Sequence, residues 1–169
     1  MTTDYDLIAK NDVFAALPTT RLEDVSLAAI ARQYSQGETI VEAGQIWPYL
    51  LLVKTGAIQA RKYSLEGRSL VVTTFTLGDI FWGLAFFYPQ RSMPVSLVAA
   101  EATRLLLWPA ERLQPVLIEN GQFAWELARL MIDKMARANE ILEEMAFQPV
   151  AGRLARLFDR VENGDLAIE

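Results

Sequence analysis

The sequence has no cysteine and no histidine among its 169 residues. Without thiolate and imidazole ligands, ordinary zinc sites, cysteine-ligated iron–sulfur clusters and thiol-based redox sensing are excluded. The same absence disfavours histidine-based acid–base catalysis and the usual haem ligation. We therefore expect no metal, no cofactor and no enzymatic activity.

Long apolar runs are missing as well. The longest uncharged apolar stretch, residues 80–88, is about half as long as a membrane-spanning helix requires. The first twelve residues carry acids where an export signal would carry basic residues. We expect a cytoplasmic protein that makes no contact with a membrane.

Basic residues are outnumbered by acidic ones, 16 against 21, and the formal net charge is −5. This sign is opposite to the electrostatic footprint of a nucleic-acid binder. The chain by itself is expected to bind DNA poorly.

The central part of the sequence has the pattern of short strands. From Gln33 to Trp108, β-branched and aromatic runs are separated by turn glycines. These glycines are Gly37, Gly44, Gly56, Gly67 and Gly78. Many short strands at this spacing predict a mainly β fold with some α, an antiparallel double-stranded β-helix or jelly roll. Residues 83–87 break the rhythm and fit either one helical turn or simple core.

Helical patterns flank this region. Residues 5–32 predict two short helices, the second starting at a capping box of Thr20 with Glu23 and keeping an apolar face as far as Ala31. A short helix is expected over 110–119.

A long helix is predicted from Gly121 to Phe147. Apolar side chains recur along it in alternating steps of three and four, which is the a/d pattern of a coiled-coil seam. The seam residues are Ala128, Met131, Met135, Ala138, Leu142 and Met145. The pattern predicts a homodimer; the alternative is that the stripe packs on the β-domain of its own chain.

The predicted organisation has three parts: residues 1–120 form the β-roll, 121–148 the dimerisation helix, and 149–169 the start of a further region. Within the last part, 150–161 is amphipathic. Its three arginines, Arg153, Arg156 and Arg160, either face phosphate or form a solvated face.

Five segments stand out in order along the chain: Gly37–Gly44, Leu52–Gly56, Glu66–Gly67, Leu77–Phe81 and Arg153–Leu157. Taken in this order, they resemble the CRP/FNR family of bacterial transcription regulators. The resemblance implies a cyclic-nucleotide-binding-like sensor, a long helix that pairs two subunits, and a winged helix-turn-helix beyond residue 169. We therefore expect an excised sensor fragment, with a natural truncation as the alternative, that reaches DNA only through the missing module.

The resemblance also implies what has happened to the nucleotide contacts. With Gly78–Asp79 and Val98–Ala99 as anchors, the family's ribose-binding glutamate falls on Gly83, its phosphate-binding arginine on Met93 and the adjacent hydroxyl on Pro94. Trp82 stands where the family has a glycine that leaves room for ligand. The alternative is a shift of two residues that brings Arg91 and Ser92 to the phosphate.

The candidate effector pocket is therefore large and mostly apolar. Its predicted residues are Phe81, Trp82, Gly83, Leu84, Tyr88, Arg91, Ser92 and Met93. Either these side chains fill the pocket themselves, or an unknown small apolar or aromatic effector binds there. Trp47 and Pro48 are assigned only to shaping a hairpin.

Three functions remain open. The first is the effector-sensing and dimerisation module of such a regulator. The second is a cupin-like metal enzyme, which the absence of histidine disfavours. The third is a ligand-free dimerisation module whose input is a partner protein.

Overall fold

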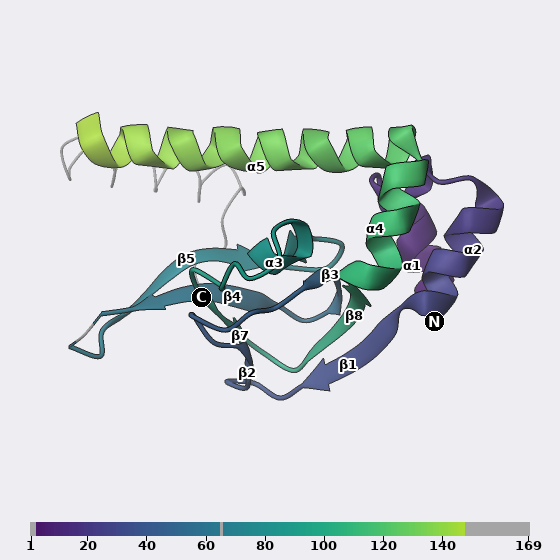
Figure 1. The fold of residues 1–169 in the computed structure, drawn as a ribbon. Coiled ribbons are helices and arrows are strands. Elements are labelled where there is room, and N and C mark those ends of the chain that lie inside the picture. The colour runs from purple at the N-terminus through teal and green to yellow at the C-terminus, as the bar shows by residue number, and fades with distance from the viewer. Residues whose placement is uncertain (1–2, 65, 148–169) are drawn as a thin grey trace, which may run out of the picture. The chain divides into compact units, whose positions relative to one another are not determined.

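The structure is a computed structural model that describes residues 3–64 and 66–147. The chain forms two compact units, residues 1–126 and 127–169, and the boundary falls inside the last helix. In the first unit, eight strands form two four-stranded antiparallel sheets, with helices before, between and after them (Figure 1).

One sheet has the strand order β1 (Ile30–Tyr34), β8 (Thr103–Pro109), β3 (Tyr49–Thr55) and β6 (Ile80–Trp82). The other has the order β2 (Thr39–Val41), β7 (Ser96–Ala99), β4 (Ile58–Tyr63) and β5 (Ser69–Phe75). Consecutive strands lie in different sheets, as in a jelly roll, except β4 and β5, which form a hairpin within one sheet. The predicted fold class is confirmed.

The core lies between the two sheets. Leu51 pairs with Leu107 on one side and with Phe81 on the other, so one row of side chains crosses three strands. Val53, paired with Leu105, adds the next row. These rows meet Ile58, Ala60 and Leu97 of the opposite sheet in one buried cluster. Leu50 and Leu52 alternate with the β3 residues of these rows and are also buried, so β3 is covered on both faces, which accounts for its continuous apolar run.

All five predicted turn glycines have left-handed backbones, with φ between 79° and 89°. Gly56 is the most constrained of them. A Cβ there would lie 2.6 Å from the carbonyl oxygen of Ala102 and 2.6 Å from Oγ1 of Thr103. The β3–β4 turn is therefore pressed against the start of β8, and only glycine fits.

The N-terminal helices are α1 (Asp4–Lys10), the 3₁₀ turn η1 (Phe14–Ala16) and α2 (Thr19–Ala28). The ring of Phe14 lies 4.8 Å from that of Trp108 and 5.5 Å from that of Phe123, between centroids. The indole N–H of Trp108 donates to the carbonyl of Val25 at 2.8 Å. The end of β8 and the start of the last helix thus share one small core with these helices.

Two details of the second helix were predicted wrongly. Helix α2 begins at Thr19 with Pro18 as its N-cap, so Thr20 is already inside the first turn and cannot cap it. The capping box forms instead at α1, between Thr3 and Asp6. The helix also ends at Ala28, because Ile30 and Ala31 pair with β8 as strand β1; Leu27 is exposed rather than part of a buried face.

The helices over 110–119 and 121–147 agree with the predictions, and residues 83–87, left open between a helical turn and simple core, form a helical turn. Residues 83–87 contain one short helix, α3 (Leu84–Phe87), and α4 (Ala110–Glu119) and α5 (Gly121–Phe147) have the expected bounds. The predicted helix over 150–161, with its three arginines, lies outside the described residues. Across residues 3–64 and 66–147, every helix is too short or too polar to traverse a lipid bilayer.

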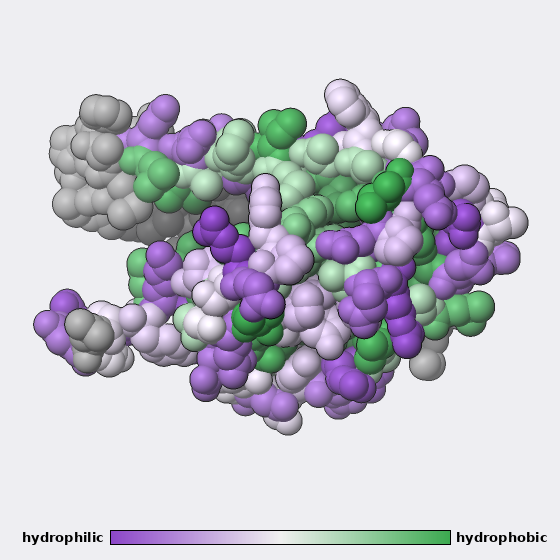
Figure 2. All heavy atoms as spheres, in the orientation of Figure 1, coloured by the Kyte–Doolittle hydropathy of each residue, from purple (hydrophilic) through white to green (hydrophobic). Residues whose placement is uncertain are grey.

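The β4–β5 hairpin extends away from the rest of the roll (Figure 1). Strand β5 is the edge of its sheet, and six of its seven residues are exposed. The end of the hairpin presents a hydrophilic surface (Figure 2). Closer to the sheet, Leu70, Val71 and Val72 are exposed apolar side chains.

Candidate effector site

The connection from β6 to α3 contains Gly83, the N-cap residue of α3. Its φ of −75° suits any residue, so its backbone conformation does not explain the glycine. The surroundings do, because a Cβ on Gly83 would overlap the carbonyl oxygen of Trp47 and lie 3.0 Å from Cε3 of the indole. The Gly83 N–H donates to the carbonyl of Tyr49 at 2.9 Å. Two backbone segments therefore approach so closely here that no side chain fits between them.

The loop between β2 and β3, residues 42–48, lies against the β6–α3 connection and forms the other side of the site. Gly44 N–H donates to the carbonyl of Met93 at 2.8 Å, and Met93 N–H donates to the carbonyl of Gln45 at 2.8 Å. Ile46 and Ser92 form an isolated antiparallel bridge. This loop is thus hydrogen-bonded along the segment that carries the predicted polar anchors.

A row of aromatic side chains connects the β2–β3 loop with β6 and β5. Ring centroids lie 5.4 Å apart for Trp47 and Tyr49, 6.3 Å for Trp47 and Phe81, and 5.1 Å for Phe75 and Phe81. Trp82 stacks on Phe81 at 6.5 Å. Trp47 is only 9% exposed and belongs to the core cluster. The row contributes large buried apolar area, with contacts in the range that aromatic pairs prefer.

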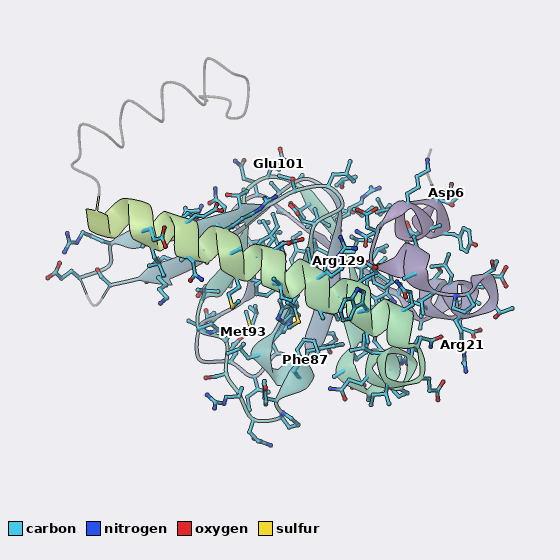
Figure 3. All side chains as sticks on the ribbon, turned by 90° about the horizontal axis from the view of Figure 1, so that it is seen from above. Asp6, Arg21, Phe87, Met93, Glu101 and Arg129 are labelled. Atoms are coloured by element: carbon cyan, nitrogen blue, oxygen red, sulfur yellow. The ribbon has the colours of Figure 1, made fainter. Side chains whose placement is uncertain are left out.

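The predicted pocket residues separate into two groups. Gly83 and Met93 are buried, and Phe81 and Trp82 are half-buried. The other four residues, Leu84, Tyr88, Arg91 and Ser92, are exposed. Met93, 2% exposed, packs in the same core cluster as Trp47. Figure 3 shows Met93 on the side of the roll where Phe87 lies, opposite Glu101.

The two polar anchors face outward because of the turn that precedes them. Arg91 N–H donates to the carbonyl of Tyr88 at 3.1 Å, and Gln90 between them has a left-handed φ of 72°. Among the described residues, Gln90 is the one non-glycine residue with a positive φ. The turn leaves Arg91 and Ser92 in solvent.

Helix α3 is held from both ends. Its N-cap bonds to β3 through Gly83 and Tyr49, and the side-chain amide of Gln114 in α4 donates to the carbonyl of Phe86. The described residues contain no group of three or more acidic side chains placed to hold a metal ion.

Trp47 was not predicted as a site residue. It was expected in a hairpin, and it does precede β3, but its contact with Gly83, which lies 36 positions further along the chain, was not expected. A signal was present in the pairing of a bulky Trp82 and an adjacent glycine, since a glycine in a strand connection marks a close backbone approach. The partner in that approach has no local signature.

The six predicted seam residues lie on α5. Ala128, Met135, Ala138 and Leu142 are exposed, with Met135 at 60% and Leu142 at 62%. Met131 is half-buried. The side chain of Met145 lies outside the described residues.

Comparisons with known proteins give a consistent set of similarities. The family model of the cyclic nucleotide-binding domain matches residues 31–120. A CRP-like cAMP-activated global transcriptional regulator of Mycobacterium tuberculosis is 20% identical over 156 residues, which are 89% of this chain and 67% of that protein.

Two solved structures have the same fold. The catabolite activator protein of Thermus thermophilus is 23% identical with a TM-score of 0.68, covering 80% of this chain and 63% of that one. The c-di-GMP responsive global regulator of Xanthomonas campestris is 17% identical with a TM-score of 0.71, covering 85% and 72%. This chain thus spans about two thirds of the length of each of these proteins.

Proposed function

Because this chain belongs to the cyclic nucleotide-binding domain family, we propose that it is the sensor and dimerisation part of a CRP/FNR-type transcription regulator that does not respond to cAMP through the family's usual contacts. The match over residues 31–120 and the CRP-like relatives confirm the expected resemblance. These relatives are regulators rather than enzymes, so they favour the sensor over the cupin-like metal enzyme.

The observation that carries this proposal is the closed approach at Gly83. The resemblance puts the family's ribose-binding glutamate at this position, and the carbonyl of Trp47 occupies the space that its Cβ would need. The position of the phosphate-binding arginine is Met93, which is buried in the core. A ribose hydroxyl or a cyclic phosphate brought here would lose its water without gaining these partners, at about 1–3 kcal/mol for each group.

Isothermal titration of this chain with cAMP and cGMP tests the proposal. We expect no saturable heat at nucleotide concentrations up to about 1 mM, because two lost partners weaken binding by roughly a hundredfold or more. Saturable binding at micromolar concentration would contradict the proposed lack of response.

The titration, repeated with variants, also tests the alternative in which Arg91 and Ser92 bind the phosphate of cAMP. In that case Arg91→Ala abolishes binding of cAMP, whereas Arg104→Ala, which removes another exposed arginine, leaves it intact. Mass spectrometry of the purified chain, without added nucleotide, tests instead for a small apolar or aromatic effector. Such a molecule bound in stoichiometric amount would favour the ligand-responsive regulator over the partner-driven module.

Dimerisation through α5 is supported by the exposed part of the heptad seam. Large apolar side chains such as Met135 and Leu142 are exposed at the same heptad position, seven residues apart. A second copy of the helix offers the same stripe, and a two-fold pairing buries both. In the complete regulator, the paired helices would set the separation of the two DNA-reading modules.

A further inference from the structure

We infer that Trp47 is the specificity-determining residue of this roll, because its side chain occupies the position where an effector would bind. The module therefore works without a small-molecule effector. This inference rests on the proposed function and gives a reason for the lack of response. It differs from a simple loss of contact residues, because it makes exclusion of ligand steric.

One loop, residues 42–48, contacts both positions at which the nucleotide contacts are missing. The carbonyl of Trp47 closes on Gly83, and Gly44 and Gln45 of the same loop exchange hydrogen bonds with Met93. The loop therefore lies between the two positions that the resemblance assigns to ribose and to phosphate recognition.

The indole of Trp47 takes the place of a bound aromatic group. It is 9% exposed, contacts Tyr49 and Phe81 ring to ring, and belongs to the buried cluster between the sheets. An aromatic ligand in an apolar pocket is held by contacts of the same type. Here the indole is covalently part of the chain, so its occupancy of the position does not depend on the concentration of a free ligand.

The loop is anchored on both sides of Trp47. Ala43 N–H donates to the hydroxyl of Ser96 at 3.0 Å, and Ala110 N–H donates to the carbonyl of Pro48 at 2.8 Å. Pro48 also restricts Trp47 to extended conformations. Moving the loop as a whole to withdraw the indole would break both bonds, which favours the filled state.

The consequence concerns α3. Because Gly83 bonds to β3 and Phe86 bonds to α4 with the indole in place, the roll already holds its short helix without any ligand. A ligand that makes no differential contact with two states cannot shift their populations. Input to this module then comes from assembly or from a partner protein.

The test removes the Trp47 side chain by substitution and then adds free indole. We expect Trp47→Ala to lower the Tm by about 10 °C, because it leaves a large cavity in the core. Indole at millimolar concentration should then raise the Tm of Trp47→Ala by several degrees while leaving the wild-type chain unchanged. Thermal unfolding followed by circular dichroism gives both values.

Two further variants make the result decisive. Trp125→Ala removes a tryptophan that is 64% exposed, so it should change the Tm little and show no response to indole. If Trp47→Ala does not fold, Trp47→Phe leaves a smaller cavity, and we expect a smaller loss with a partial response to benzene. An unchanged Tm in Trp47→Ala, or an equal indole response in the wild-type chain, would overturn the inference.

These outcomes are distinguishable from failure of the proposed function. Binding of cAMP by the wild-type chain removes the proposed lack of response and the inference with it. No binding of cAMP together with no effect of indole on Trp47→Ala removes only the inference, and leaves the missing contacts as the reason for the lack of response.

Discussion

At the scale of single residues, Gly83 and Gly121 can be compared directly. Neither has a positive φ, and they differ in what surrounds them: a Cβ at Gly83 meets Trp47, whereas a Cβ at Gly121 meets nothing within 4 Å. Comparing their alanine variants separates steric exclusion from backbone conformation.

We expect Gly83→Ala to destabilise the chain by about 3 kcal/mol or more, because the loop carrying Trp47 must move or the strand must bend. Gly121→Ala should change stability by less than about 1 kcal/mol, and in the favourable direction, because alanine suits a helix better than glycine. Urea unfolding of both variants measures the difference. Equal stabilities would mean that the Trp47 loop is not seated against α3.

Tyr34 at the end of β1 gives the structure a pH dependence in the alkaline range. Burial raises the pKa of its hydroxyl above the ordinary 10.0, with Glu38 and Tyr49 adding to the rise and Arg32 opposing it. The unfolded chain therefore loses this proton first as the pH rises. The contribution of Tyr34 to stability is complete below pH 10.0 and is lost as the pH rises through the higher pKa of the folded state.

The corresponding variant is Tyr34→Phe, which cannot ionise. Between pH 9 and pH 11, the free energy of unfolding of the wild-type chain should fall more steeply than that of Tyr34→Phe, about as expected for one titrating group. Urea unfolding across this range provides the comparison. Parallel curves would show that Tyr34 ionises equally in both states.

At the scale of elements, β5 is an exposed strand at which two molecules could pair and aggregate. It is an edge strand, and Leu70, Val71 and Val72 are 64%, 43% and 48% exposed. An exposed apolar edge is a template for pairing between molecules. A lysine on such a strand interrupts that pairing.

Val72→Lys should therefore reduce aggregation on heating, with a change in stability within about 1 kcal/mol because the side chain is already exposed. The change in net charge works against this outcome, since an added lysine moves the charge of −5 toward zero. Thr74→Lys adds the same charge on the same strand without removing an apolar side chain. Light scattering during heating should show less aggregation for Val72→Lys than for Thr74→Lys; equal scattering would exclude the apolar edge as the cause.

Most helices and strands could be predicted from the sequence, whereas contacts between distant loops could not. The strands, their five left-handed glycines and the helix over 121–147 follow from period and turn chemistry, which are local. The start of α2 was missed because its N-cap is Pro18, two positions before the expected Thr20. The contact of Trp47 with Gly83 was missed for a different reason: it depends on how two distant loops meet, and no periodicity records that meeting.

At the scale of the whole molecule, assembly and stability are coupled if α5 is the dimer interface. Pairing of two copies stabilises the folded state by mass action, so the Tm of a dimer rises with protein concentration. In a monomer the Tm is independent of concentration. The seam of α5 allows this difference to be tested with one substitution at two neighbouring places.

Ala138 lies on the seam, Ala136 lies off it, and both are exposed on the same helix. Replacing either by glutamate adds one charge and costs the helix about the same propensity, but only Ala138→Glu places charges of like sign against each other in the pair. We expect the wild-type chain and Ala136→Glu to sediment as dimers at micromolar concentration, with a Tm that rises by a few degrees for each tenfold increase in concentration. Ala138→Glu should sediment as a monomer with a constant Tm, because burying two unpaired carboxylates costs several kcal/mol. A wild-type chain that sediments as a monomer would contradict dimerisation through α5, and the two variants would then have constant Tm values.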